Sequence, residues 1–385
     1  MSALREVAQR ANVSLLTAYN VLSNAHVASI TNEIRQAVLD SASNLNYHLN
    51  ITIKDVAAQA EVSIATVSYV LNNSVPVSAP TRERVLEAAA ALNYRPNITA
   101  RNLQASETRM IGYAWHEVPP GQMNPVMDRF IYCMALAAES AGYHVLTFTQ
   151  PRKNETRAYE DLIRSNRVDG FVLSNLKVSD KRIPHLIDMG VPFAAFGRSN
   201  NQVDFPFVDV DGRYGIRTCM EHLFERGHEK IAYLGWSLVD ERVHGYFDAL
   251  HSAGIKRNPE WVVRTHDTLM EAGNAVHPLI DLPEKERPTA IVCASDMMAI
   301  GVMRFLGSVG LRVGIDIAIT GFDDHPMSEF LYPSLTTIRQ PIEWLAQKVI
   351  DLLLAEINKV QLPERHIIVP PELIVRGSSS QYFAD

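Results

Sequence analysis

Between residues 51 and 97, apolar residues recur every three or four positions, as they do in short amphipathic helices. Thr52 and Asp55 can form a capping box at the start of a first helix. After a tight turn, Ser63 can cap a second helix over 64–72, and a third helix follows. The apolar face of the third helix is made by Val85, Ala88, Ala89 and Leu92. A helix, a short turn and a second helix form the geometry that places the second helix in the major groove of DNA.

From Met110 onwards the pattern changes, because short apolar runs alternate with longer stretches of helical periodicity. The apolar runs lie at 111–115, 144–148, 170–173, 193–196, 231–234, 290–293 and 317–320. The helical stretches lie near 125–141, 155–166, 212–226, 241–253, 269–280 and 296–309. This alternation predicts an α/β fold with parallel sheets covered by helices on both faces. The segment is long enough, at about 275 residues, for two such lobes.

Residues 1–50 resemble a second, degraded copy of the helical segment, offset by 49 positions over the first two helices and by 47 after a loop that is two residues longer. Leu4–Ala8, for example, matches Ile53–Ala57. The copy lacks the capping threonine, which is replaced by Ala3, and no hinge-like segment follows it. Because its buried positions are kept, we expect it to fold. Whether it reads bases, or only packs or dimerises, stays open from the sequence.

Length and charge set broader limits. A chain of 385 residues indicates two or three domains. Residues 1–106 carry eight Lys and Arg against seven Asp and Glu, whereas the remainder carries 28 against 36. A head that is less acidic than the body fits DNA binding only weakly. The chain has no apolar run of membrane-spanning length and no apolar signal core at its start, so a cytoplasmic location is expected.

An enzymatic interpretation finds little support. The side chains that catalysis would use are three carboxylates and three histidines, namely Asp296, Asp323, Asp324, His116, His228 and His244. None has the spacing of a phosphate loop, a zinc-binding helix or a nucleophile elbow. The three cysteines are far apart and form no CxxC motif, which argues against a disulfide framework or a zinc site. We expect neither catalysis nor a metal or cofactor.

Specific motifs add a family resemblance. Three stretches of this chain closely resemble the headpiece and hinge of the LacI/GalR (lactose-repressor) family. They are TIKDVAAQAEVSIATVSYVLNN (52–73), TRERVLEAAAALNYRPN (81–97) and ARNL (100–103). Four further stretches resemble the effector domain of that family, namely RGHEKIAYLG (226–235), ASD (294–296), TGFDD (320–324) and LTTIRQP (335–341). The resemblance implies all-α helix-turn-helix headpieces before a two-lobed core of the type I periplasmic-binding-protein kind.

The same resemblance divides the chain into domains. It implies a degenerate headpiece over 1–50, a headpiece over 51–96, a hinge helix over 97–106 and an effector-binding and dimerisation core over 107–385. Within the core, lobe 1 is expected at about 107–210 and 342–369, and lobe 2 at about 211–341 and 370–385.

The resemblance also implies a DNA-contacting set. Ile64, Ala65 and Tyr69 would face base edges, and the hydroxyls beside them would reach phosphates. In the hinge, Leu103 would wedge open a base step in the minor groove. The full expected set is Ser63, Ile64, Ala65, Thr66, Ser68, Tyr69, Asn97, Ala100, Arg101 and Leu103. Each small residue also has a plain alternative as a cap or core filler.

Ligands of open α/β sheets bind outside the carboxyl ends of the strands. That rule, with the family motifs, selects Trp115, His116, Arg198, Trp236, Arg242, Asp296 and Asp323. Arg242 matches the family arginine that reaches ligand hydroxyls or a carboxylate, and the two aspartates match hydroxyl acceptors. The loop Asp267-Thr268-Leu269 lacks the aromatic that relatives often carry, which shifts stacking to either Trp, although both could be ordinary core residues. Asp209 and Asp211 could line the lobe junction, with a helix N-cap as the alternative for Asp211.

We therefore expect a ligand-responsive, sequence-specific transcription regulator, a repressor in the simplest case, which binds a pseudo-palindromic double-stranded operator as a homodimer. By resemblance, its effector is a sugar or sugar derivative. A transport-type binding protein is the rival, but it would need a signal peptide and would have no headpiece. The effector's identity, the sign of its effect, the operator and the choice between dimer and tetramer stay open.

Overall fold

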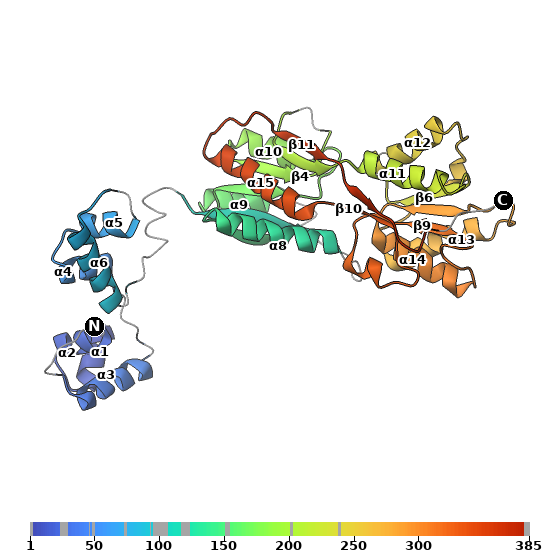
Figure 1. Cartoon of the computed structure of the whole chain (residues 1–385). Coiled ribbons are helices and arrows are strands. Elements are labelled where there is room, and N and C mark those ends of the chain that lie inside the picture. The colour runs from blue at the N-terminus through green and yellow to red at the C-terminus, as the bar shows by residue number, and fades with distance from the viewer. Residues whose placement is uncertain are drawn as a thin grey trace. The chain divides into compact units, whose positions relative to one another are not determined.

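The computed structural model describes most of the chain, in two compact units, Met1–Ser106 and Glu107–Asp385, each of which is described by itself (Figure 1). The described residues are 3–23, 30–45, 47, 51–72, 75–92, 94, 107–116, 124–150, 155–200, 203–237 and 240–380.

The first unit contains two three-helix modules, each with its own apolar core. The first module consists of α1 (Ala3–Arg10), α2 (Leu15–Leu22) and α3 (Asn32–Asn44). The second consists of α4 (Ile53–Gln59), α5 (Ile64–Asn72) and α6 (Ala79–Ala91). The turn before the second helix is alike in both, because Asn12 and Glu61 have φ angles of 53° and 52°. The repeat seen in the sequence is thus a repeat of structure, down to a left-handed turn residue.

The first lobe of the core is built on a six-stranded parallel sheet with the order β11-β5-β4-β3-β1-β2. Its strands are β1 (Met110–His116), β2 (His144–Gln150), β3 (Gly170–Leu173), β4 (Phe193–Phe196), β5 (Phe207–Val210) and β11 (His366–Val369). Its helices are α8 (Pro125–Ser140), α9 (Arg157–Arg164), α10 (Arg182–Asp188) and α15 (Ile342–Ile357). Helices α8 and α15 lie side by side, and α9 and α10 belong to a separate apolar cluster with Phe171 and Leu173 (Figure 1).

The second lobe has a four-stranded parallel sheet with the order β7-β6-β8-β9. Its strands are β6 (Ile231–Gly235), β7 (Val262–Arg264), β8 (Ala290–Cys293) and β9 (Ala318–Thr320). Its helices are α11 (Gly212–Phe224), α12 (Glu241–Ser252), α13 (Leu269–Ile280), α14 (Asp296–Ser308) and the short 3-10 turns η1 (Pro259–Trp261) and η2 (Pro326–Glu329). Strands β6 and β8 are buried along their whole length, as expected for a sheet covered on both faces.

The lobes are joined by three passages of the chain, from β5 to α11, from β10 (Thr337–Arg339) to α15, and from β11 to β12 (Glu372–Ile374). Strands β10 and β12 pair antiparallel. None of the described helices is both long and apolar enough to span a bilayer.

Two glycines allow the helices of the second lobe to pack closely. A Cβ at Gly245 of α12 would lie 2.2 Å from the carbonyl oxygen of Arg213 in α11. A Cβ at Gly301 of α14 would lie 2.1 Å from the carbonyl oxygen of Leu269 in α13. The first contact matters for the site described below, because it fixes the N-terminal half of α12 against α11.

Candidate DNA interface and ligand site

Helix α5 presents one face to the core of its module and the opposite face to solvent. Val67 and Val70 are buried, whereas Ile64 is 45% exposed and Tyr69 is 41% exposed. Ala65 is exposed between them. The three residues expected to face base edges therefore lie on the solvent face of this helix, and a duplex could contact them without rearrangement of the core.

The start of α5 is fixed by a cap. Ser63 Oγ accepts a hydrogen bond from the Thr66 N–H at 3.0 Å, and the two hydroxyls are 2.9 Å apart. The plain capping role of these two residues is thus visible, while their contact with phosphates stays a prediction, as does that of the half-buried Ser68. The expected hinge contacts, Asn97, Ala100, Arg101 and Leu103, lie outside the described residues.

The first module builds the same surface with different side chains. Ser14 Oγ accepts from the Thr17 N–H at 3.0 Å, as Ser63 does in the second module. Leu15 is 43% exposed and Leu16 is 68% exposed. These leucines are equivalent to Ile64 and Ala65, so the helix start of the first module also faces solvent.

Arg242 is the centre of the ligand site predicted in the core. It lies in the first turn of α12, which Asp240 caps by accepting from the Val243 N–H at 3.1 Å. Its guanidinium carbon lies 3.8 Å from the centre of the Phe322 ring and 5.0 Å from that of Trp236. One guanidinium N–H donates to the carbonyl oxygen of Ala294. Cation–π contacts and this hydrogen bond hold the charge in place at the carboxyl ends of β6 and β8.

Three carboxyl groups feel the charge of Arg242, namely those of Asp209, Asp267 and Asp323. Burial raises the pKa of each, well above its usual range for Asp323, and the guanidinium lowers these pKa values only in part. Asp209 accepts from Nε of Arg198 at 2.6 Å. Arg242 is thus near three desolvated carboxyl groups, and Arg198 pairs with one of them.

Asp323 is held in an unusual conformation. Its φ angle is 123°, a region that L-residues rarely adopt, and its Oδ1 accepts from Gln340 Nε2 at 2.7 Å. The backbone N–H of Asp323 donates to the carbonyl of Ile338 at 2.7 Å. Strain of this kind persists only where surrounding contacts enforce it, and it is frequent at ligand sites.

Asp296, which is predicted to accept ligand hydroxyls, is enclosed by protein donors. It is 1% exposed, and its carboxylate accepts from Ser328 Oγ at 2.7 Å, from the His325 N–H at 2.7 Å and from Thr337 Oγ1 at 2.5 Å. Two of these donors tie the loop after β9 to the start of α14, and the third, Thr337, ties β10 to it. The expected contact of Asp296 with ligand hydroxyls stays a prediction, and its carboxylate already accepts hydrogen bonds from protein donors.

The aromatic candidates differ in their surroundings. Trp236 is half-buried beside Arg242, whereas Trp115, at the end of β1, is 40% exposed and lies edge-on to Tyr113 with ring centres 6.3 Å apart. The side chain of His116 lies outside the described part of the structure. Asp211, the other junction candidate, caps α11 by accepting from the Tyr214 N–H at 2.9 Å.

Sequence reasoning missed two members of the cluster around Arg242. In the sequence, Asp267 stands out only because its loop lacks the aromatic residue that relatives often carry. In the structure, its Oδ1 accepts a hydrogen bond from Ser295 Oγ at 2.5 Å. Gln340 was seen as part of a family motif and not as a partner of Asp323. Their position after strand ends was the available signal, because Asp267 follows β7 as Asp323 follows β9.

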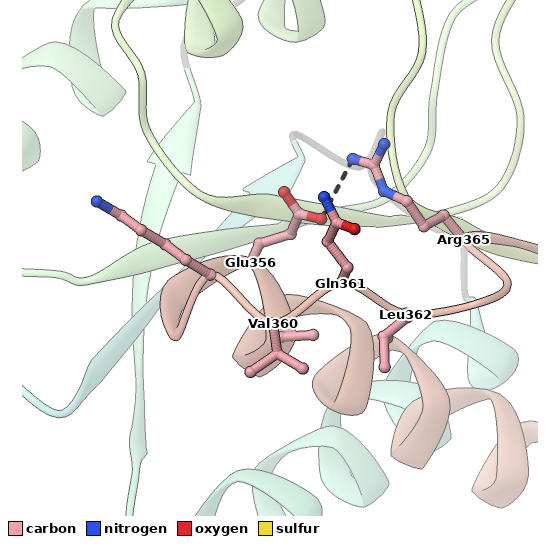
Figure 2. A pocket seen from close by; sticks show the side chains of 7 residues that line it. Glu356, Val360, Gln361, Leu362 and Arg365 are labelled. Carbon is pink, nitrogen blue, oxygen red and sulfur yellow. Dashed lines mark ion pairs between the residues drawn. The ribbon is translucent and has the colours of Figure 1, made fainter.

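A hollow elsewhere in the core contains none of the predicted residues. It has a volume of about 420 Å³ and is lined by Ala355, Glu356, Lys359, Val360, Gln361, Leu362 and Arg365 (Figure 2). Arg365 and Glu356 form an ion pair across it, with a shortest N···O distance of 3.2 Å. No cluster of His, Cys, Asp and Glu suited to a metal ion occurs among the described residues.

Comparison with known families places both sites in context. Residues 52–97 match the model described as "Bacterial regulatory proteins, lacI family", and residues 220–379 match that of a periplasmic binding protein-like domain. The lac repressor dimer bound to operator and the anti-inducer ONPF is 29% identical, with a TM-score of 0.73 over 86% of this chain and 99% of that chain. The complex of the transcriptional regulator CelR with cellobiose is 28% identical, with a TM-score of 0.65 over 86% of this chain and 100% of that chain.

Curated relatives extend the likeness beyond the fold. The transcriptional repressor CytR of Escherichia coli K12 is 31% identical over 85% of this chain and 96% of its own length. The transcriptional regulator GalR of the same organism is 33% identical over 86% of this chain and 96% of its own length. These relatives are transcription regulators and not enzymes. With identities above 30% over nearly the whole of both relatives, this chain belongs to the LacI family of bacterial regulatory proteins.

Proposed function

We propose that this regulator binds a pseudo-palindromic operator as a homodimer in the cytoplasm and that a small neutral polyhydroxyl compound, a sugar or sugar derivative, controls that binding. The observation that carries the proposal is the pairing, in one chain, of a capped helix with an exposed apolar face and a charged site at the strand ends of a two-lobed core. Two-fold symmetry of the dimer implies two-fold symmetry of the DNA site.

On the DNA side, α5 supplies apolar contacts and one phenol. Ile64 and Ala65 suit thymine methyl groups, and the Tyr69 hydroxyl can form a hydrogen bond with a base edge. Residues 97–104 are too few to form a stable helix alone, so pairing of two such segments, with Leu103 as the wedge, would complete the interface.

The charges of the core site select its ligand class. Arg242 interacts electrostatically with Asp209, Asp267 and Asp323, and Arg198 pairs with Asp209, so an added anion would lie near more carboxyl groups than guanidinium groups. A neutral ligand with several hydroxyls could form hydrogen bonds with these carboxyl groups and accept from the edge of Arg242. The half-buried indole of Trp236 offers an apolar face nearby. The cellobiose complex of CelR supports the same ligand class.

The switch couples the core site to the paired hinges. A ligand that binds one lobe arrangement more tightly shifts the population towards it, and this changes the separation of the two hinges. Release from DNA and enhanced binding are both physically permitted, because only the differential affinity decides the sign.

The test of DNA recognition is selection of bound sequences from random duplex DNA at a stated salt concentration. We expect an enriched palindrome, and its absence would sink the proposal. The ligand class is tested by a thermal-shift screen of sugars, sugar phosphates, nucleosides and amino acids. Neutral sugars should raise the Tm and their phosphorylated forms should not, whereas stabilisation by non-sugars alone would contradict the sugar assignment.

A further inference from the structure

The described residues of the two helical modules include a polar contact between side chains that are 36 positions apart in the chain. The hydroxyl of Tyr19, on α2 of the first module, donates to Asp55 Oδ1, on α4 of the second module, at 2.7 Å. Each module has its own apolar core, so this hydrogen bond connects two modules that pack around separate cores.

Asp55 has a reason to accept this second partner. Its Oδ2 is engaged within its own module, where it accepts from the Thr52 N–H at 2.8 Å and the Thr52 hydroxyl at 2.6 Å. The capping box thus fixes the carboxylate and leaves Oδ1 for a donor from outside. These hydrogen bonds, opposed by partial burial, hold the pKa of Asp55 below its usual value, so the acceptor is ionised near neutrality.

Tyr19 is also a position at which the two repeats differ. With the offset of 49, its equivalent in the second module is Ser68, whose side chain is far shorter than a phenol. Conversely, the equivalents of Thr52 and Asp55 are Ala3 and Glu6, and Glu6 pairs with Arg10 of its own helix at 3.4 Å. The two modules are therefore not interchangeable in this contact. The first module carries the donor, and the second carries the acceptor that its capping box holds in place.

We propose that Tyr19 docks the first module onto the first turn of α4, so that the two modules of each chain are presented in one fixed arrangement. The partner of this surface of α2 is a segment of the same chain. Leu15 and Leu16, at the start of the same helix, stay exposed in the docked arrangement. Partial burial and the hydrogen bond to Asp55 raise the pKa of Tyr19 to about 12, which keeps the phenol a donor at any physiological pH. The docking does not depend on whether the first module contacts DNA.

The test measures the distance between the modules in the full chain, free of DNA. Spin labels are placed through Glu33→Cys on α3 and Glu87→Cys on α6, both of which replace exposed residues, while the three native cysteines are buried. Mixing with an excess of unlabelled chain restricts the signal to distances within one protomer. We expect a narrow distance distribution that Tyr19→Phe broadens about twofold, since the substitution removes only the hydroxyl.

Two further variants keep the test decisive. Tyr47→Phe removes a hydroxyl from a residue packed on the core of the first module, and its distribution should stay narrow. Tyr19→Ser installs the side chain that the second module carries at the equivalent position, so it is compatible with the fold and should broaden the distribution as Tyr19→Phe does. A broad distribution in the unaltered chain, or a narrow one in both Tyr19 variants, would overturn the proposal.

Discussion

Arg242, which we propose to contact the ligand, is held in place by its neighbours. The rings of Phe322 and Trp236 lie against its guanidinium, and the carbonyl oxygen of Ala294 accepts a hydrogen bond from one of its N–H groups. The orientation of the charge is therefore fixed without a ligand. Such preorganisation reduces the entropy lost on binding. Removing the guanidinium would leave Asp209, Asp267 and Asp323 without its compensating charge.

Arg242→Ala should therefore abolish the effector response while operator binding persists. Loss of a charged partner in a buried site costs a few kcal/mol of binding free energy, which raises the Kd of the ligand about a hundredfold. Calorimetry with a stabilising sugar and an operator mobility-shift titration measure the two activities. Arg217→Ala, at an exposed position of α11, is the matched control and should change neither. Unaltered sugar affinity in Arg242→Ala would remove Arg242 from the site.

Two buried histidines predict how acid affects the core. Burial, with the nearby charge of Arg226 as a second cause, lowers the pKa of His222 and of His228 to about 4. Each ring is hydrogen-bonded to a hydroxyl, His222 to Ser379 at 2.7 Å and His228 to Thr289 at 3.0 Å. The unfolded chain, with His pKa values near 6.5, binds more protons than the folded chain between pH 6.5 and 4. Their stabilising contribution, present above pH 6.5, is lost as the pH falls towards 4.

The measurement is the free energy of unfolding by denaturant at several pH values from 7 to 4.5. Asp267 and Asp323 have raised pKa values and oppose the trend, so the informative quantity is the difference between variants. His222→Gln should lessen the loss on acidification by roughly 1–3 kcal/mol. Identical pH profiles for the variant and the unaltered chain would show that His222 titrates normally in the folded protein.

At the scale of elements, the duplicated cap offers a matched pair of substitutions. Ser63→Ala should lower the stability of the second module by about 1 kcal/mol and weaken operator binding, because the start of α5 loses its N-cap. Ser14→Ala removes the equivalent cap of α2 and should cost the first module a similar amount without changing the preferred DNA sequence. Thermal unfolding and DNA selection measure these effects. Equal losses of sequence preference in both variants would mean that both modules read bases.

For the whole molecule, the first module should extend the DNA footprint through backbone contacts. Deletion of residues 1–49 should shorten the protected DNA and reduce affinity while the preferred core sequence stays the same. Footprinting and sequence selection with full-length and truncated chains test this directly. An unchanged footprint and affinity would make the module a packing or interaction unit, and a changed preference would make it a base-reading one.

Local patterns predicted many of the helices and strands of both units, but not all of them. Helix caps and apolar periodicity act over about four residues, so the sequence indicated α5 with its Ser63 cap and the alternation of buried strands with helices. The strands β5, β7, β10, β11 and β12 and the helices α10 and α15 were not predicted, whereas β9, which has three residues as β7 does, was. Motifs placed Arg242 and Asp323 in the ligand site, and these assignments stay predictions.

Contacts between residues distant in sequence depend on the tertiary structure alone. Arg242 meets the carbonyl of Ala294 across 52 residues, Asp296 is occupied by Thr337 across 41, and Tyr19 reaches Asp55 across 36. The sequence does not distinguish two kinds of aspartate that follow a strand. One kind faces a ligand, as proposed for Asp323, and the other is enclosed by protein donors, as Asp296 is. Which of these holds depends on how loops from different strands pack, because burial and hydrogen-bond partners are properties of that packing and not of neighbouring residues.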